Sequence, residues 1–563
     1  AIGKSALLTA NQTTAVTSHN VGIGRSAGRF ITTGVENTLI GALAGDALTD
    51  ADFNVAVGYA ALSSDTLGSK SVAIGQGALN EQNFTTATDA HNTAVGHAAG
   101  NRISTGVRNT IVGGLAADAV TTGQYNSVLG FGALTAETSG SASIAIGYLA
   151  LSAQNTQATN YNTAVGYEAG KSVTTGIQNT IIGGEAGDAL TDADDNVAVG
   201  YHALSSDTLG SRAVAMGRGA LFTQNFTTAT ANYNVGIGYF AGVAVTTGQQ
   251  NTLVGGLAGD ALTDGQINTA LGYAALSADT RGQRAVAIGG LALTSQNITT
   301  ESESYNVGVG YAAGTSVTTG VQNTIIGGLA GDFLSDADAN TAVGFGSLSA
   351  DSLGSQSVAI GYLALLSQNF TTATDSFNVA VGSQAGRNVT TGIRNAIVGS
   401  LAGDALQDAD FNTVLGFNAL TTDTLGSKST AIGTEALHTQ NFTTATDTFN
   451  TAVGYNAGYS VTTGKQNTLL GGTAGDAITT GTNNVAVGYL ALTTETAGDN
   501  NVAIGRSALA SQNVTTGGNV HNVAVGHGAG SSVTTGIENT FVGGQAGNNC
   551  STGQGNTVLG YNA

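Results

Sequence analysis

The sequence predicts an all-β fold, a parallel β-solenoid or β-roll of about 32 coils, mostly 17 residues each, grouped in four-coil super-repeats. Two observations predict it. A short motif that ends in glycine recurs along all 563 residues, and the chain holds 84 glycines but no proline. Proline cannot donate to a strand ladder and is excluded from central strands. A chain without proline is therefore expected to commit its backbone N–H groups almost everywhere.

The repeat unit begins with asparagine, continues through Thr or Val and two apolar residues, and ends in glycine, as in 162–166 and 179–183. Counting these anchor glycines from Gly3 to Gly560 gives 32, and most follow one another at the even step that separates Gly24, Gly41 and Gly58. Every fourth step is longer. Complete super-repeats, each four coils long as from Gly24 to Gly96, cover 24–525. We expect 1–563 to be one continuous array with partial coils at both ends, a window of a longer chain.

A coil of about 17 residues suits two short strands joined by turns. The β-branched runs end at glycine, and Thr-Thr-Gly triplets such as 174–176 recur between them. Glycine supplies positive φ at a corner without a steric penalty. We therefore expect the coils to stack in register at the spacing of neighbouring strands.

The asparagine four residues before the anchor glycine is present in 25 of the 31 coils that have this position. In register, these amides predict a ladder that hydrogen-bonds each coil to its neighbours. The alternative is that each asparagine starts a turn through its own backbone. The exceptions are Ser71, Ser143, Ser357, Ser429, Ala213 and Ala285.

The apolar residues of each motif point to both faces of the strand. Ile181 and Ile182, for example, project from opposite faces because side chains alternate along a strand. Strands that are apolar on both faces are buried on both faces. One face fills the interior of the coil and the other needs a second surface, so the pattern predicts a homo-oligomer packed around an axis.

Composition excludes several partners. The chain carries 16 Lys and Arg against 36 Asp and Glu, a formal charge of −20, which repels nucleic acid and anionic membranes. No apolar run reaches the roughly 18 residues of a membrane span, so we expect no membrane insertion in this segment. Cys550 is the single cysteine, and it excludes an intrachain disulfide.

The histidines do not indicate catalysis. His19, His91 and His521 precede the ladder asparagine at a position that elsewhere holds Tyr or Phe, and His97 and His527 follow an anchor glycine, where Tyr is common. A position that accepts several flat rings favours packing over a ligand or base. The glycine-rich motifs follow strands but open no helix, which excludes a phosphate cradle. We predict no enzyme activity, no catalytic residue and no cofactor-binding residue.

Acidic turns are the strongest candidates for chemistry. Asp46, Asp50 and Asp52 have a spacing at which carboxylates hold Ca²⁺. The corresponding turns at 118–123 and 476–481 lack two of the three carboxylates. This favours solvated turns, with weak Ca²⁺ binding as the alternative, and we assign no metal ligand. The triplet recurs at Asp188, Asp192 and Asp194, at Asp332, Asp336 and Asp338, and at Asp404, Asp408 and Asp410.

Tyrosines follow many of the anchor glycines. Eleven of the 16 tyrosines stand there, among them Tyr239, Tyr273 and Tyr311. They predict either a ladder of rings packed on one another or an exposed stripe on which sugars stack. Four Asn-Phe-Thr tripeptides match the N-glycosylation sequon, which internal duplication explains equally well. They begin at Asn83, Asn225, Asn369 and Asn441.

Two known families resemble this chain over its whole length. The motifs 71–75 and 357–361, followed by Ala78 and Ala364, resemble the head repeats of trimeric autotransporter adhesins. The form at 162–170 is similar to repeats of phage tail-fibre proteins. The resemblance implies a trimeric, left-handed parallel β-roll on a cell or virion surface. The coils here are longer than in the adhesin heads, and no coiled-coil stalk, membrane anchor or C-terminal chaperone segment is recognisable.

These observations predict a structural shaft of an extracellular or virion-borne fibre, which gives length and stiffness to an adhesive appendage. Its main partner is the chain itself, as a homotrimer or a longer filament. The alternative is an adhesin that binds cell-surface glycans or host receptors along the shaft. Ice binding by threonine arrays is a third hypothesis, and a tailspike-type glycosidase would need paired carboxylates in a cleft.

Overall fold

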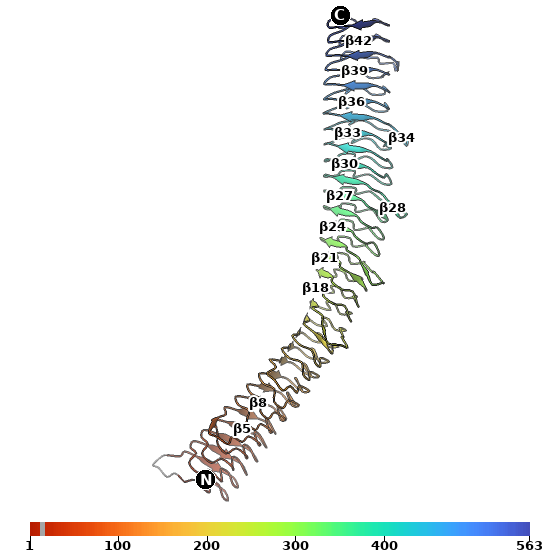
Figure 1. The fold of residues 1–563 in the computed structure, drawn as a ribbon. Coiled ribbons are helices and arrows are strands. Elements are labelled where there is room, and N and C mark those ends of the chain that lie inside the picture. The colour runs from red at the N-terminus through yellow and green to blue at the C-terminus, as the bar shows by residue number, and fades with distance from the viewer. Residues whose placement is uncertain (12–16) are drawn as a thin grey trace. The chain divides into compact units, whose positions relative to one another are not determined.

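The structure is a computed structural model that describes residues 1–11 and 17–563. The described residues form strands and turns and contain no helix. They divide into two compact units, Ala1–Gln283 with Thr299–Glu301, and Arg284–Ile298 with Ser302–Ala563. Each unit is a parallel β-solenoid in which one short strand follows another along the axis of the unit (Figure 1). The predicted fold class is confirmed in each unit, and the continuity of the array over 1–563 stays a prediction.

The first unit is built on a ladder of three-residue strands, one per coil. Neighbouring strands pair in parallel and in register, as where Thr163, Ala164 and Val165 face Thr180, Ile181 and Ile182. The strands are β1 (Val21–Ile23), β2 (Thr38–Ile40), β3 (Val55–Val57), β5 (Val72–Ile74), β7 (Thr93–Val95), β8 (Thr110–Val112), β9 (Ser127–Leu129), β10 (Ile144–Ile146), β11 (Thr163–Val165), β12 (Thr180–Ile182), β13 (Val197–Val199), β15 (Val214–Met216), β17 (Val235–Ile237), β18 (Thr252–Val254) and β19 (Thr269–Leu271).

The second unit repeats this ladder. Its strands also pair in parallel with the equivalent residue one coil away. They are β21 (Val286–Ile288), β23 (Val307–Val309), β24 (Thr324–Ile326), β25 (Thr341–Val343), β27 (Val358–Ile360), β29 (Val379–Val381), β30 (Ala396–Val398), β31 (Thr413–Leu415), β33 (Thr430–Ile432), β35 (Thr451–Val453), β36 (Thr468–Leu470), β37 (Val485–Val487), β39 (Val502–Ile504), β41 (Val523–Val525), β42 (Thr540–Val542) and β43 (Thr557–Leu559).

Second strands are rarer than the sequence predicts. We expected two strands in each coil, but only two-residue strands flanking the long loops of the super-repeats accompany the main ladder. The rest of each coil consists of turns, many of whose non-glycine residues adopt positive φ near 50–60°, such as Leu204 and Gln178. The two-residue strands are β4 (Gly68–Ser69), β6 (Thr88–Asp89), β14 (Gly210–Ser211), β16 (Thr230–Ala231), β20 (Gly282–Gln283), β22 (Ser302–Glu303), β26 (Gly354–Ser355), β28 (Thr374–Asp375), β32 (Gly426–Ser427), β34 (Thr446–Asp447), β38 (Gly498–Asp499) and β40 (Gly518–Asn519).

The interior of each coil is thin and filled by small and branched side chains. The middle residue of every described main strand except the terminal β43 is buried, as Ile181 and Ala198 are. The alanine and leucine of the following turn join it, as Ala203 and Leu204 do. Removing such apolar surface from water stabilises each coil by about 25 cal/mol for every Å² buried.

The asparagine ladder is confirmed, and it bonds mainly to the backbone. The side-chain oxygen of Asn162 accepts a hydrogen bond of 2.8 Å from the backbone N–H of Asn179, one coil further along. The amide nitrogen of Asn162 donates to the carbonyl of Gly176 at 2.8 Å. Because these amides are buried, each supplies a partner to backbone groups that water cannot reach.

Candidate functional surfaces

The outward-facing residues of the main strands form an uncharged surface with an apolar column along each unit. We call the first and third residues of the three-residue strands, taken together, the outer sheet face. Its third position is Val, Ile, Leu or Met in every main strand. Ile182 of β12 is 39% exposed while Ile181 is fully buried, so the predicted division of the two isoleucines between opposite faces is confirmed.

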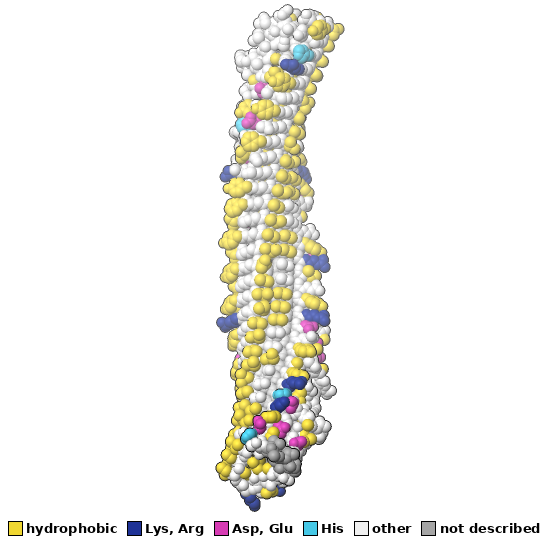
Figure 2. Space-filling model, turned by 90° about the vertical axis from the view of Figure 1, so that its left-hand side faces the viewer, with side chains coloured by type: hydrophobic (Ala, Val, Ile, Leu, Met, Phe, Trp, Pro, Cys, Tyr) yellow, Lys and Arg dark blue, Asp and Glu magenta, His cyan; other side chains and the backbone are white. Residues whose placement is uncertain are grey.

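No charged residue interrupts the outer sheet face in the described strands. Its first position is Thr or Val in most strands, with Ser127, Ile144 and Ala396 as the exceptions. Figure 2 shows continuous columns of hydrophobic side chains on the side of the molecule that it presents. Soluble monomers rarely expose a contiguous apolar surface of more than a few hundred Å², and larger ones mark interaction sites.

A second column consists of the residues that directly follow the anchor glycines, which we call the post-glycine column. Tyr201, Tyr239 and Tyr273 belong to it and are 48%, 52% and 62% exposed. Rings stack directly where successive coils both carry one, as Tyr148 and Tyr167 do with their centroids 5.3 Å apart. The predicted ring ladder is therefore present in short runs.

Elsewhere in the post-glycine column, a ring alternates with a glycine. A Cβ atom placed on Gly256 would lie 3.7 Å from the ring of Tyr273, and one on Gly472 would lie 3.5 Å from the ring of Tyr489. Each ring thus leans over the glycine of the preceding coil. This arrangement leaves about half of each ring open to solvent and to ligands.

A buried polar cluster, which the sequence did not lead us to expect, crosses each long loop. Asp351 is fully buried, and its carboxylate accepts hydrogen bonds from the backbone of Gly354 at 3.0 Å and of Phe370 at 3.1 Å. It also accepts one from the amide of Gln368 at 2.6 Å. The oxygen of Gln368 in turn accepts from the ladder residue Asn378 at 2.9 Å.

The same cluster recurs around Asp65, Asp207 and Asp423, and glutamate takes the place of aspartate at Glu137 and Glu495. Burial raises the pKa of Asp423, and its backbone and glutamine donors act against that rise. The sequence does carry a signal for this cluster: an Asp or Glu in one coil and a glutamine at the equivalent position of the next. In four clusters the glutamine also donates to the serine that replaces the ladder asparagine, at Ser71, Ser143, Ser357 and Ser429.

The acidic turns join coils instead of gathering around a cation. The carboxylate of Asp332 accepts a hydrogen bond of 2.5 Å from Ser349 of the next coil. Asp336 accepts one of 2.5 Å from Thr319 of the preceding coil. Asp338 likewise binds the backbone N–H of Val321 at 2.8 Å. In the described part of the chain, no three His, Cys, Asp or Glu side chains converge as a metal site would require.

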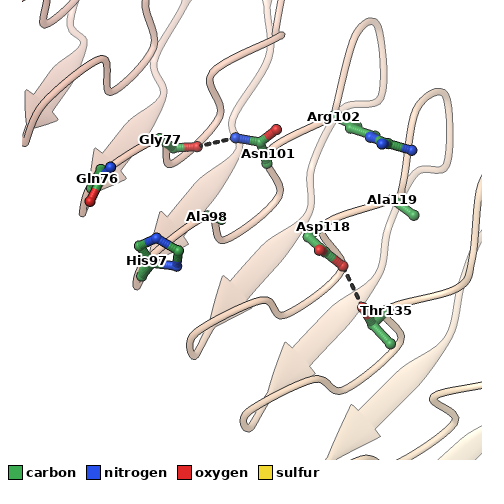
Figure 3. Close-up of a pocket in the computed structure, with 9 residues that line it drawn as sticks. All are labelled: Gln76, Gly77, His97, Ala98, Asn101, Arg102, Asp118, Ala119 and Thr135. Atoms are coloured by element: carbon green, nitrogen blue, oxygen red, sulfur yellow. Dashed lines mark hydrogen bonds between the residues drawn. The ribbon is translucent and has the colours of Figure 1, made fainter.

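A polar hollow lies on the surface of the first unit (Figure 3). It is a cavity of about 460 Å³, where Asn101 donates to the carbonyl of Gly77 at 2.9 Å and Thr135 donates to the carboxylate of Asp118. His97 and Asp118 come from neighbouring coils, and among the described residues no hydrogen bond joins them.

No family model, no curated protein and no solved structure matches this chain. The resemblance to adhesin heads and tail fibres therefore stays a prediction. The described residues also include no helix long and apolar enough to cross a membrane. Any functional conclusion rests on the surfaces themselves.

The remaining sequence candidates lie on the surface. His19, His91 and His521 are exposed, as are His97 and His527. Cys550 is a free thiol of intermediate exposure. The sequon asparagines each accept a hydrogen bond from a hydroxyl of the preceding coil, with distances of 3.0–3.3 Å at Asn83, Asn225, Asn369 and Asn441.

Proposed function

We propose that this chain is the structural shaft of an extracellular or virion-borne fibre, in which three copies pack through their outer sheet faces. The observation that carries the proposal is the unbroken run of Val, Ile, Leu or Met at the third position of every main strand. A solvated sheet face ordinarily alternates polar residues with the apolar ones beneath. A lone chain has no reason to keep an apolar column on its outside.

The backbone supports a mechanical role. Within each unit, main strands bond in parallel to the equivalent strand of the neighbouring coil, and the buried asparagine amides add a second set of bonds beside them. Solenoid stability is approximately a sum of nearest-neighbour terms, so length is added without a new core. Such an array resists bending and extension because each coil is bonded to the next at several points.

Native mass determination of the full chain tests the assembly. We expect three copies for the wild type. The double variant Ile182→Lys and Ile326→Lys places a charge on the outer sheet face of each unit and should shift the mass to one copy while the far-ultraviolet circular dichroism stays that of β structure. The matched variant Gln178→Lys and Gln322→Lys changes exposed residues of the same two coils and should stay trimeric. A wild-type chain that stays monomeric at high concentration would refute the packing.

The post-glycine column favours a second candidate, binding of surface glycans along the shaft. Half-exposed tyrosines such as Tyr239 and Tyr273 offer ring faces to the C–H groups of sugars. A glycan array probed with the full chain tests it. Sugars that bind the wild type, and bind the Tyr239→Ala and Tyr273→Ala variants more weakly, support an adhesin. If no sugar binds, the shaft function alone is supported.

A further inference from the structure

One place on the first unit departs from the regularity of the repeats. Three successive coils, those of β13, β15 and β17, enclose a surface cavity of about 400 Å³ that includes Tyr201 and Arg218 of the post-glycine column. This volume lies within the roughly 300–1,000 Å³ of typical ligand pockets. Its walls are mainly aromatic and a single arginine stands among them. We call it the Arg218 notch, and its lining consists of Tyr201, His202, Arg218, Phe222, Phe240 and Val243 with the backbone of Gly219.

The guanidinium group of Arg218 lies between two rings. Its central carbon is 5.9 Å from the ring centroid of Tyr201 and 5.8 Å from that of Phe240. Cation–π contact within about 6 Å holds a guanidinium over a ring face. Gly219 makes room for this arrangement, because a Cβ atom there would overlap the ring of Phe240.

The histidine side of the notch is equally ordered. The ring of His202 meets Tyr201 edge-on with centroids 3.9 Å apart, and it meets Phe222 edge-on at 5.6 Å. A nitrogen of His202 also lies 3.3 Å from the carboxylate of Glu185. This contact pairs Glu185, the acid nearest to the notch, with the imidazole of His202.

Arg218 carries no ion pair among those formed within the described residues, and its side chain is exposed. Two other arginines of the first unit differ. Arg212 lies 3.6 Å from the carboxylate of Asp195, and Arg281 lies 2.7 Å from that of Asp264. A chain with 36 acidic residues and 16 basic ones thus leaves a cation free between two aromatic walls.

The residues of the notch occur together only here, at the junction of two super-repeats. In a duplicated array, independent changes would be scattered, but here three aromatic departures from the other copies converge in one cavity. Arg506 has the same place in the last complete super-repeat, where Leu490, Ala510 and Gly528 stand in place of the aromatic walls. The positions of His202, Phe222 and Phe240 hold no Phe, Tyr or Trp in any other complete super-repeat.

We propose that the Arg218 notch binds a carboxylated sugar, a uronic-acid residue of a surface polysaccharide. Arginine binds a carboxylate through two parallel hydrogen bonds, which fixes the orientation of the acid group. The rings of Tyr201, Phe222 and Phe240 would cover the apolar face of the sugar ring. The net charge of −20 repels nucleic acid and other long polyanions, so the proposed ligand is a short acidic sugar segment held by contacts inside the notch.

This proposal narrows the glycan-binding candidate to one site and one ligand class, and it does not depend on the shaft. Isothermal titration of the full chain with tri-galacturonic acid tests it, with the methyl ester of the same trisaccharide as the uncharged control. We expect binding of the acid and at least about tenfold weaker binding of the ester, the factor for one charged hydrogen-bonded pair. Absence of binding by the acid, or equal binding of the ester, would overturn it.

Variants locate the site. Arg218→Gln and Phe240→Ala should each weaken binding of the acid about tenfold or more, whereas Arg506→Gln should leave it unchanged. Equal losses in the Arg218 and Arg506 variants would show diffuse attraction and overturn the assignment. Tighter binding of a nucleoside monophosphate than of the acid would also overturn the sugar class. Neutral sugars that bind the Arg218→Gln variant as well as the wild type would show that glycans bind elsewhere on the post-glycine column, and would overturn the notch. Native mass determination tests the shaft proposal separately.

Discussion

The side-chain oxygen of Asn323 accepts a hydrogen bond of 3.0 Å from the backbone N–H of Asn340, one coil further along the chain. The amide nitrogen of Asn323 donates at 2.7 Å to the carbonyl of Ala337. One buried side chain thereby satisfies two backbone groups of the next coil. A slip of register by one residue would break both bonds at once, so the ladder specifies alignment as well as stabilising it.

Asn323→Ala should destabilise its own coil and the next. Two buried backbone groups lose their partners, and each unsatisfied group costs about 1–3 kcal/mol. Deuterium exchange resolved by peptide should show faster exchange around β24 and β25. The matched variant Asn501→Ser should change exchange little, because serine occupies the equivalent place in four other super-repeats. Unchanged exchange in Asn323→Ala would show that the ladder adds no stability.

Gly471→Ala should disrupt its coil far more than Gly472→Ala. Gly471 has φ of 139°, and a Cβ atom there would lie 2.6 Å from the carbonyl oxygen of Gly488 in the next coil. Strain of this kind costs about 1–3 kcal/mol before any clash is counted. A Cβ on Gly472 would meet the ring of Tyr489 at an ordinary 3.5 Å. Limited proteolysis should cut the first variant near β36 and spare the second, and equal resistance of the two would contradict this account.

Asp351→Ala should open the long loop that follows β27. Its removal takes one partner from the amide of Gln368 and from two backbone N–H groups, and each buried donor left unsatisfied costs about 1–3 kcal/mol. Asp336→Ala removes an exposed turn carboxylate and should cost less than about 0.5 kcal/mol. Chemical denaturation followed by exchange of the β26 and β28 region measures both. Similar losses of stability in the two variants would show that the buried cluster stabilises the fold no more than an exposed turn carboxylate does.

Asp260→Asn should stabilise the first unit at neutral pH. Burial raises the pKa of Asp260, and its Oδ1 atom is buried with no hydrogen-bond partner among the residues that the structure describes. Between the ordinary value near 3.8 and the raised value, the folded chain binds more protons than the unfolded chain. The stability contributed by protonation is therefore lost as the pH rises through this window, and the penalty is complete above it.

Thermal unfolding of the wild type and the Asn variant at pH 7 and at about pH 4 measures this difference. The variant should melt higher at pH 7, and its advantage should shrink at the lower pH, where the carboxyl of the wild type is protonated. The remaining charge repulsion is nearly the same in both proteins, so their difference isolates this one group. An advantage that grows on acidification would contradict the direction of the pKa change.

Positions that recur with the repeat were predictable from the sequence, because the same type of residue returns at the same place in each coil. Asn162 and Ile181 recur at a fixed distance from the anchor glycine, and the structure places the first in the ladder and the second in the interior. Away from the long loops, the described coils lack the predicted second strand, because positive φ at residues such as Leu204 turns the chain where a strand was expected. Residues of many types adopt positive φ in these turns, so residue type alone does not predict this conformation.

Contacts made by residues outside the motif were harder to predict. Asp351 and Gln368 lie one coil apart in loops that read as polar turns, and only the fold shows that they are buried together. The Arg218 notch was not predicted from the sequence for a similar reason. Its residues belong to three coils, and each one alone resembles a chance substitution in a variable turn.

The cluster of acid, glutamine and asparagine has a consequence for how the chain can lengthen. Asp207 needs Gln224 across the long loop, and Gln224 needs Asn234 at the start of the next block. Copying the coil of Asp207 alone, or the coil of Gln224 alone, would leave an acid or a glutamine without its partner. The cluster therefore favours duplication of whole four-coil blocks over duplication of either coil by itself, in line with the four-coil period of the sequence.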